Sequence, residues 1–356
     1  MMEKTLKRTV VVLFFLLIFG LSLAHILLPD TEISVSERRY LDTFPEITAS
    51  KVFSGRYFTE LEAYLLDQFP LREEFRTVKA LTEFYALDMG ETGGIMLSEG
   101  HLLPVEAVFH EGQAALAVEK MNDIVETCLD GEAYLAIVPD KGYFLGEETP
   151  REIISYVTEG VHARYIDITD LLSLDDFYTT DSHWRQENIL PLARELCREL
   201  GVPVVPAAGY SRADCGTFYG VYAGQSALPC APDAMAYLVS GGTENALVHS
   251  IETGDMAVYD PAAIGNVDPY DVFLGGPQAV VTIENPNAVS DRHIVIFRDS
   301  FASSLAPLMI DSFREITLVD LRYVRSDLLG EYVDFENADI LFLYSTSMLN
   351  TASLLK

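Results

Sequence analysis

Two short segments of the sequence carry residues that could perform nucleophilic catalysis. The first is Asp181-Ser182-His183-Trp184. In an extended loop, side chains two positions apart point the same way. Asp181 can therefore hold His183 in the tautomer whose other ring nitrogen faces outward as a general base. Trp184, the only tryptophan in the chain, would form a wall of the site. An Asp-x-His triplet alone is weak evidence, because an ordinary surface loop explains it equally well.

The second segment is the apolar run His293–Phe297 followed by Arg298-Asp299-Ser300-Phe301. It places Ser300 where a predicted strand ends and a helix begins, at the sheet edge that usually binds ligands. Free N–H groups at a helix start can hold an oxyanion. The alternative is that Ser300 or Asp299 simply caps the helix. Together the two segments supply a nucleophile (Ser300), a base (His183) and an orienting carboxylate (Asp181).

Other catalytic motifs are absent from the sequence. It contains no HExxH, Walker loop, GxGxxG after a strand, GxSxG or CxxC, and its seven histidines are scattered. Metalloprotease, NTPase, dinucleotide-binding and ordinary α/β-hydrolase functions therefore lack support. The sequence predicts no metal site and no cofactor.

The elements that must position these residues have the pattern of a parallel α/β sheet, in which short apolar runs alternate with helices. The predicted strands are Ala133–Val138, Tyr165–Ile168, Ala279–Ile283, His293–Phe297, Ile316–Val319 and Ile340–Tyr344. The predicted helices are Gln113–Leu129, Gln186–Leu200, Phe301–Ser312 and Arg322–Leu329.

Ahead of this domain, the stretch Phe53–Leu87 repeats apolar residues at helical spacing, and Pro70 restarts it as a second helix. We therefore expect a signal anchor over 1–29, a helical N-terminal segment over 30–95 and an α/β domain over 96–356. Residues 201–276 are rich in Gly, Pro and Ala with weak periodicity, so this stretch is expected to be an irregular insertion.

The first thirty residues predict attachment to a membrane. Lys4, Lys7 and Arg8 precede an apolar run from Val10 to Leu28, and about 20 apolar residues span a bilayer. The basic flank predicts a single-pass anchor with everything after Pro29 outside the cytoplasm. The other interpretation is a cleaved signal peptide ending near Ser22-Leu23-Ala24.

The net charge limits the classes of binding partner, and the cysteines raise the question of a disulfide. The chain has 54 acidic and 24 basic residues, a net charge of −30, so it lacks the basic surface that nucleic acid or anionic lipid headgroups need. Outside the cytosol, Cys215 and Cys230 could close the loop between them as a disulfide. Cys128 and Cys197 lie in helix-like segments and are expected to be thiols.

A set of ordered segments resembles the DHHW family, membrane-anchored extracytoplasmic proteins similar to the alginate O-acetyltransferases of the SGNH-hydrolase superfamily. The segments are Ser36-Glu37-Arg38-Arg39-Tyr40-Leu41, Asp67-Gln68-Phe69-Pro70-Leu71-Arg72, Val138-Pro139-Asp140-Lys141, Asp181-Ser182-His183-Trp184, Arg298-Asp299-Ser300-Phe301 and Asp320-Leu321-Arg322-Tyr323. Ser182 replaces the first histidine of the DHHW tetrad.

The resemblance implies a flavodoxin-like, three-layer SGNH-type domain in which Asp-x-His precedes the serine. It makes Ser300 the nucleophile, His183 the base and Asp181 its orienting carboxylate. Related enzymes complete the oxyanion hole with a Gly N–H and an Asn side chain. Gly275 or Gly276 can be offered for the glycine, whereas Pro277 follows without an N–H and no Asn is assigned.

Lys141 is expected either to contact the polymer or the oxyanion, or to be a solvated loop residue. The function expected from the resemblance is an extracytoplasmic O-acetyltransferase or acetylesterase that acts on a cell-surface glycan through acetyl-Ser300, beside a membrane-bound O-acyltransferase. The alternative is a catalytically inactive glycan-binding or scaffold subunit of an exopolysaccharide modification or export complex.

Overall fold

The structure is a computed structural model that describes residues 2–356. Its contacts divide the chain into two compact units. The N-terminal unit comprises the chain up to Gly94 together with Ala223–Pro229, and the α/β unit comprises Ile95–Tyr222 and Cys230–Lys356. The chain passes from one unit to the other after Gly94, within the short helix α9 (Val221–Ser226) and after Pro229.

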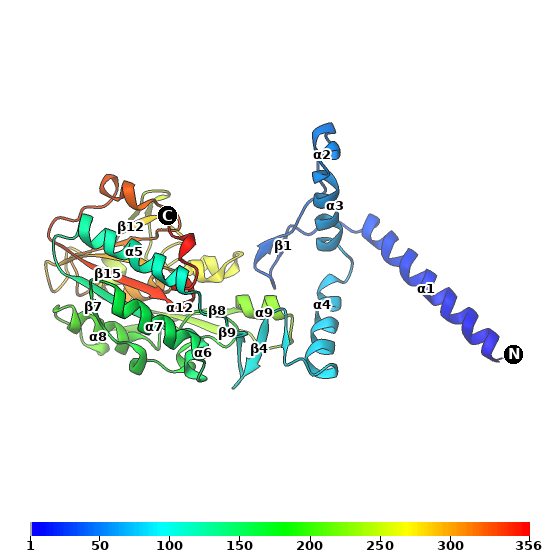
Figure 1. Ribbon diagram of the computed structural model, residues 1–356, viewed down its shortest axis with the longest axis horizontal. Helices are drawn as coiled ribbons and strands as arrows, with labels where there is room; N and C mark the ends of the chain where they lie inside the picture. The colour runs from blue at the N-terminus through cyan, green and yellow to red at the C-terminus, as the bar shows by residue number, and fades with distance from the viewer. Residues whose placement is uncertain (1) are drawn as a thin grey trace. The chain divides into compact units, whose positions relative to one another are not determined.

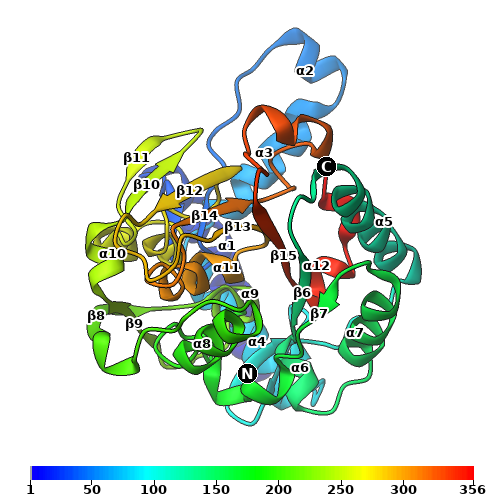
Figure 2. The same cartoon turned by 90° about the vertical axis from the view of Figure 1, so that its left-hand side faces the viewer.

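The α/β unit (Figure 1) is built on an eight-stranded sheet with the order β11-β10-β12-β14-β13-β15-β6-β7, whose strands are labelled in Figure 2. The five strands from β14 to β7 pair in parallel, whereas β12, β10 and β11 extend the sheet in antiparallel fashion. The parallel strands are β6 (Ala133–Val138), β7 (Arg164–Tyr165), β13 (His293–Arg298), β14 (Glu315–Val319) and β15 (Ala338–Ser345). The antiparallel strands are β10 (Leu247–Ser250), β11 (Gly254–Met256) and β12 (Val280–Glu284).

Helices cover both faces of this sheet, which gives three layers. Figure 2 shows α5 (Glu111–Cys128) and α7 (Thr149–Gly160) on one side of the central strands and α8 (Leu190–Glu199) and α11 (Phe301–Leu305) on the other. Alternate residues of β15 enter the two cores: Leu341 and Leu343 face α8 and α11, while Ile340 and Phe342 face α5 and α7. Burial on both faces explains why the central strands are almost continuously apolar. The predicted three-layer α/β fold is confirmed.

The smaller elements of the α/β unit lie mostly at its rim. They are the hairpin strands β4 (Ile95–Ser98) and β5 (His101–Pro104), the hairpin strands β8 (Ser211–Phe218) and β9 (Asp233–Val239), and the short helices α6 (Lys141–Phe144), α10 (Gly241–Asn245) and α12 (Thr346–Leu349). The stretch 201–276 is therefore not irregular throughout. It contains the antiparallel pair β8–β9 and a second antiparallel pair, β10–β11, which belongs to the main sheet.

One predicted helix is wrong and others are shorter than predicted. Residues 322–329 form no α-helix but a turn followed by a 3₁₀ helix at Ser326–Glu331. The Asp320 carboxylate accepts from both the backbone and the guanidinium of Arg322, and such local bonds compete with helix formation. The helix after Ser300 is α-helical only to Leu305, because Pro307 follows in a 3₁₀ turn.

The N-terminal unit contains α2 (Ala49–Phe53), α3 (Arg56–Asp67) and α4 (Arg72–Leu81), with a break around Pro70 as predicted. Its short strands are β1 (Ile33–Ser34), β2 (Arg39–Tyr40) and β3 (Glu91–Thr92).

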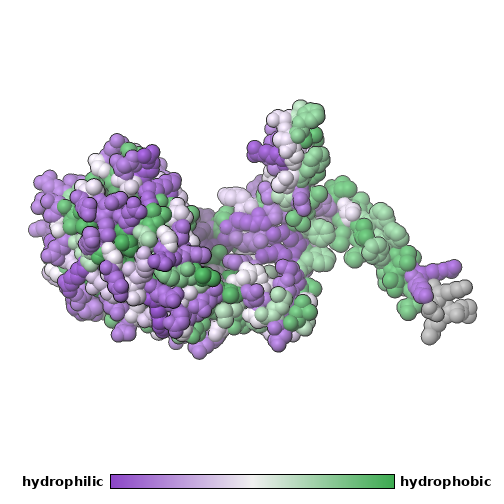
Figure 3. Space-filling view, viewed as in Figure 1, coloured by the Kyte–Doolittle hydropathy of each residue, from purple (hydrophilic) through white to green (hydrophobic). Residues whose placement is uncertain are grey.

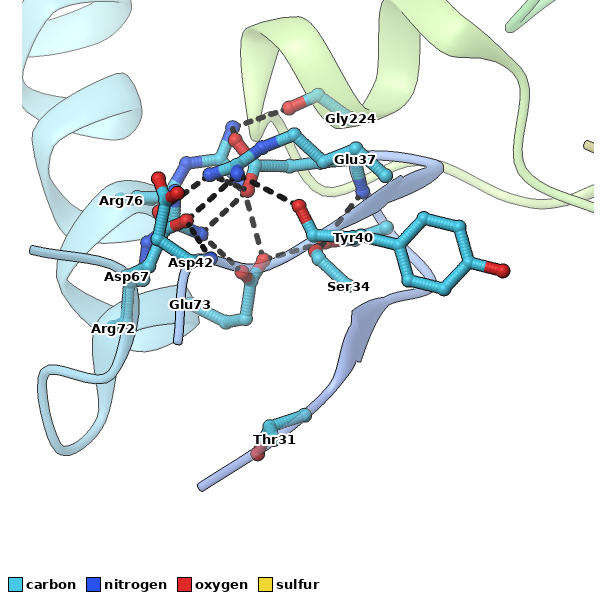
Figure 4. Close-up of polar contacts among 12 residues, drawn as sticks. Thr31, Ser34, Glu37, Tyr40, Asp42, Asp67, Arg72, Glu73, Arg76 and Gly224 are labelled. Carbon is cyan, nitrogen blue, oxygen red and sulfur yellow. Dashed lines mark hydrogen bonds and ion pairs between the residues drawn. The ribbon is translucent and has the colours of Figure 1, made fainter. Parts of the chain in front are cut away.

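Charged residues of two of the sequence segments meet in this unit. Arg39 donates to both oxygens of Asp67, at 2.7 and 2.5 Å, and Glu37 pairs with Arg72 at 2.6 Å and Arg76 at 3.3 Å. Figure 4 shows Glu37, Asp67, Arg72 and Arg76 converging on one another. These two segments are therefore structural partners.

The first helix, α1 (Met2–Leu27), is long and apolar enough over Thr5–Leu27 to span a membrane, and none of that stretch is buried. Figure 3 shows hydrophobic residues covering it. Among the described residues it is the one helix with this property. Its length and composition fit the predicted anchor.

Candidate active site

Asp181, His183 and Ser300 form a continuous hydrogen-bonded line, although His183 and Ser300 lie 117 positions apart in the sequence. The His183 Nδ1 atom is 2.6 Å from Asp181 Oδ1, and Nε2 is 2.7 Å from Ser300 Oγ. In the tautomer that satisfies both contacts, Nδ1–H donates to the carboxylate and the serine hydroxyl donates to Nε2. This is the geometry that a serine nucleophile needs, because the imidazole can take the hydroxyl proton as attack begins.

The carboxylate of Asp181 is fully buried and held by neutral donors. Its Oδ2 accepts from the Val221 N–H at 2.9 Å, and its Oδ1 accepts from the His183 N–H at 3.1 Å. Gly220 packs so tightly here that a Cβ atom would lie 2.3 Å from the Thr180 carbonyl and 2.4 Å from the Asp181 Cβ. Only glycine therefore lets the chain pass this close to the Asp181 loop.

The loop that carries Asp181 and His183 is shaped by its own backbone and by Asp233. The Tyr178 N–H donates to the His183 carbonyl at 3.0 Å, which closes the loop as a tight turn. The Asp233 carboxylate accepts from the N–H and hydroxyl groups of both Thr179 and Thr180, at 2.6 to 3.0 Å. These five bonds fix Tyr178, Thr179 and Thr180, the three residues before Asp181, and so hold the loop that carries both site side chains.

Ser300 sits at the turn between β13 and α11. Its side chain makes no helix-capping bond. The capping oxygen comes from Asp299, whose Oδ1 accepts from the Phe301 N–H at 3.1 Å while its Oδ2 accepts from the Ser345 N–H at 2.8 Å. Asp299 thereby ties the turn to the end of β15, and Ser300 Oγ is left to His183. Within residues 2–356 the Ser300 N–H donates to no backbone or side-chain acceptor, so it can serve as one oxyanion donor.

Trp184 does not line an accessible site, contrary to the sequence prediction. It is fully buried, donates from Nε1 to Ser304 Oγ at 2.8 Å and packs edge-on against Phe301 with 5.0 Å between ring centroids. The ring is large and apolar, and the core behind the site offers it both burial and a partner for its N–H. It supports the site from behind and contacts no solvent.

Lys141 is not the solvated loop residue of one of the two expectations. Only 3% of the residue is exposed, and Nζ donates to the Leu102 carbonyl at 3.0 Å and the Thr179 carbonyl at 3.4 Å. Burial lowers the pKa of Lys141 to about 8, against the opposing effect of the Asp181 and Asp233 charges. The ammonium group therefore joins β5 to the loop before Asp181.

Gly275 and Gly276 form a turn with positive φ angles of 66° and 79°. A Cβ atom on Gly276 would lie 2.0 Å from Asp271 Oδ1, so the turn requires glycine. The Gly276 N–H donates to the Phe273 carbonyl at 3.2 Å and is not available to an oxyanion. The Asn side chain of the related oxyanion holes has no counterpart assigned here.

The predicted disulfide between Cys215 and Cys230 does not form, and both cysteines are free thiols. In the β8–β9 ladder Phe218 pairs with Asp233. Cys215 lies three residues inside the ladder from that pair, and Cys230 lies three residues outside it. The two cysteines therefore lie on opposite sides of the Phe218–Asp233 pair along the ladder. This separates them, whereas a disulfide needs Cα atoms within about 7 Å of each other.

Sequence reasoning missed Tyr270, whose ring stacks on His183 with 3.8 Å between centroids and an interplanar angle of 14°. It lies in the 3₁₀ helix Pro269–Val272. This is within the stretch whose weak periodicity gave no functional signal, and no spacing in the sequence connects it to His183.

A cavity of about 160 Å³ adjoins the Asp181–His183 loop through Ser182 and Tyr222. Three carboxylates line it: Glu106, Asp140 and Glu147. Burial, reinforced by the charges of Glu106 and Asp140, raises the pKa of Glu147 to about 7. The cavity has hydroxyl and amide groups from α12 and the residues after it on its other side, including Ser347 and Asn350. Within residues 2–356, no group of three or more His, Cys, Asp or Glu side chains is placed to hold a metal ion.

Solved structures with the same architecture are known. A DHHW family protein from Eubacterium siraeum matches with a TM-score of 0.59 and 21% identity, over 73% of this chain and 93% of its own. The chain shares its fold with a DHHW family protein. This confirms the predicted resemblance to the DHHW family at the level of the fold.

Two further structures are similar. Bacillus cereus PatB1, solved with a sulfonyl adduct, matches with a TM-score of 0.59 and 18% identity, over 72% of this chain and 95% of its own. The O-acetyltransferase domain of Pseudomonas putida AlgJ covers 72% of this chain and 92% of its own, with a TM-score of 0.41 and 12% identity. No protein-family model and no curated protein matches the sequence.

Proposed function

We propose that this protein is a serine-dependent O-acetyltransferase or acetylesterase that acts on a cell-surface polysaccharide. The observation that carries the proposal is the line of contacts at 2.6 and 2.7 Å joining Asp181, His183 and Ser300. The fold shared with PatB1 and a DHHW family protein is consistent with it.

The reaction follows from these three groups. Ser300 Oγ attacks the acetyl carbonyl carbon of the donor while its proton passes to His183 Nε2. The carboxylate of Asp181 stabilises the imidazolium that forms, and the Ser300 N–H donates to the developing oxyanion. The tetrahedral intermediate collapses, His183 returns the proton to the leaving oxygen, and acetyl-Ser300 remains. A sugar hydroxyl, deprotonated by His183, then attacks the ester carbonyl carbon. The Ser300 Oγ–acetyl bond breaks, and His183 returns the proton to Ser300 Oγ; water in place of the sugar would give an acetylesterase.

The preferred acceptor is a neutral or amino-sugar glycan. The chain outside the predicted anchor has 53 acidic and 21 basic residues, and the cavity beside the site is lined by Glu106, Asp140 and Glu147. Both the net negative charge of the chain and the carboxyl groups of the cavity would repel a polyanionic polymer. The apolar helix α1 supports the further proposal that the α/β unit works outside the cytoplasm, anchored in the membrane beside a membrane-bound O-acyltransferase.

A second candidate function is a catalytically inactive glycan-binding or scaffold subunit of an exopolysaccharide modification or export complex. The observation that favours it is the oxyanion hole, because the Gly276 N–H is bonded within its own turn and no Asn donor is assigned. Loss of one oxyanion donor costs about 10²- to 10³-fold in rate.

Hydrolysis of a chromogenic acetyl ester by the full chain in detergent separates the two. We expect Ser300→Ala to remove all release above background and the exposed-surface control Ser155→Ala to leave it unchanged. Release that persists undiminished in Ser300→Ala, with both proteins folded by circular dichroism, would contradict the acetyl-serine mechanism. No release from the wild type would favour the scaffold function.

A further inference from the structure

The aromatic ring of Tyr270 lies flat against the imidazole of His183. The ring centroids are 3.8 Å apart, the planes differ by 14°, and Tyr270 is 4% exposed. Phe301 also contacts the imidazole, at 5.3 Å and a tilt of 52°. The stacked contact is therefore the closest that any described aromatic ring makes with His183.

Tyr270 is itself held at both ends. Its hydroxyl donates to Ser304 Oγ at 2.7 Å, and the same oxygen accepts from Trp184 Nε1 at 2.8 Å. Its N–H donates to Asp268 Oδ1 at 2.9 Å, which starts the 3₁₀ helix. The backbone cap and the packing of the ring among buried neighbours, including Phe273 with 4.9 Å between centroids, hold the ring in one orientation, and the hydroxyl bond only adds to this.

The hydrogen bonds of His183 leave one motion uncontrolled. Bonds at Nδ1 and Nε2 fix two points at opposite ends of the imidazole, about which the ring can still rock. A planar partner on its face removes this freedom. The face of the Tyr270 ring is electron-rich. It therefore attracts the positively charged imidazolium that forms during acyl transfer more than it attracts the neutral imidazole that precedes it. Burial raises the pKa of Tyr270 far above its ordinary value, so the phenol stays neutral at working pH.

We propose that Tyr270 is a positioning residue of the active site, which fixes the plane of His183 by stacking and stabilises its protonated form. The expected effect of Tyr270 on catalysis rests on the proposed function. Its effect on the orientation of the His183 ring does not. It assigns a role to the stretch 201–276, which the sequence left without one.

The test compares Tyr270→Phe, which keeps the ring and loses only the hydroxyl, with Tyr270→Leu, which loses the ring. Phe342→Leu is the matched control, because it removes a fully buried aromatic ring on the opposite face of the sheet. Two readouts are taken on the full chain in detergent. One is kcat and KM for the chromogenic acetyl ester. The other is the downfield proton resonance of the His183 Nδ1–H, assigned by its loss in His183→Ala.

We expect Tyr270→Leu to lower kcat at least tenfold with KM nearly unchanged, and to broaden or abolish the downfield resonance. Tyr270→Phe should keep the resonance and stay within about threefold of the wild-type kcat. Phe342→Leu should lower the unfolding temperature without changing either readout per folded molecule.

A Tyr270→Leu protein that keeps both the resonance and kcat would overturn the proposal, as would a Tyr270→Phe protein that loses as much as Tyr270→Leu. If the wild type hydrolyses nothing, the proposed function fails separately, and the resonance still decides whether Tyr270 positions His183.

Discussion

The charged groups beside the candidate site and those of the N-terminal unit are held in different ways. In the α/β unit, Asp181 is fully buried and bonded to neutral donors, and Lys141 is buried against carbonyl oxygens. In the N-terminal unit, Arg39 and Asp67 bond directly as an ion pair while the Arg39 side chain stays 39% exposed. One arrangement buries each charged group among hydrogen-bonding partners, and the other pairs opposite charges to hold chain segments together.

This difference predicts opposite responses to pH. Burial raises the pKa of Asp140, beside the site, to about 6, with the Asp299 charge adding to the effect. In the N-terminal unit the hydrogen bonds from Arg39 lower the pKa of Asp67, against the effect of its burial. Asp140 therefore favours folding when protonated, whereas Asp67 favours folding when ionised.

The largest effect is expected from Asp181→Asn, which replaces one acceptor oxygen of the carboxylate with an NH₂ donor. In Asp181→Asn the amide NH₂ can face His183 Nδ1, which forces the tautomer that cannot take the Ser300 proton. We expect kcat/KM for the acetyl ester to fall by roughly 10²- to 10⁴-fold, no more than in His183→Ala. The exposed control Asp291→Asn should retain wild-type activity. An Asp181→Asn protein within threefold of wild type would mean that the carboxylate does not orient His183.

A smaller effect is expected when the charge of Asp140 is removed. The folded carboxyl keeps a proton up to about pH 6, whereas the unfolded one releases it near pH 4, so this group's contribution to stability declines as pH rises from 4 to 6. Asp140→Asn keeps an oxygen for the Thr346 hydroxyl, which donates to Asp140 at 2.6 Å. The free energy of unfolding of the variant, relative to that of the wild type, should therefore be about 1 to 2 kcal/mol higher at pH 7 than at pH 4. Urea unfolding at both pH values measures this; a difference that does not change with pH would refute it.

The smallest effect is expected from the ion pair of the N-terminal unit. Arg39→Ala should lower the free energy of unfolding by about 1 kcal/mol at low salt and by less at 1 M salt, because the ion pair is partly exposed and salt screens it. The loss should be complete above the unfolded pKa of Asp67 and should vanish as pH falls through its lower folded value. Arg325→Ala, which breaks a more exposed pair with Asp327, should change stability by less than about 0.5 kcal/mol. Equal losses in the two variants, measured by urea unfolding, would contradict a structural role for the Arg39 pair.

The parts of the fold that sequence predicted are those whose signal is local. The strands β6, β13, β14 and β15 were all identified to within two residues at each end, because burial on both faces makes them continuously apolar. The edge strand β11 and its neighbour β10 could not be predicted. They have four residues or fewer and are partly exposed, so neither shows a continuous apolar run.

The same rule divides the site. Asp181, His183 and Ser300 could be found because each sits in a short segment whose order resembles a known family. Tyr270, Val221 and Gly220 could not, since a stacked ring, an N–H donor and a missing Cβ act through tertiary contacts that leave no spacing. The burial of Lys141 and Trp184 could not be predicted either, because burial of a lysine or a tryptophan depends on what packs over it.

The strand β15 holds the serine turn without contributing a residue to the proposed triad. It is the last of the eight strands in chain order, yet it lies between β13 and β6. Its final residue, Ser345, supplies the N–H that holds Asp299 beside Ser300. A change that loosens β15 would therefore separate β13 from β6 and free the serine turn, so the alignment of Ser300 with His183 depends on a strand that contains neither residue.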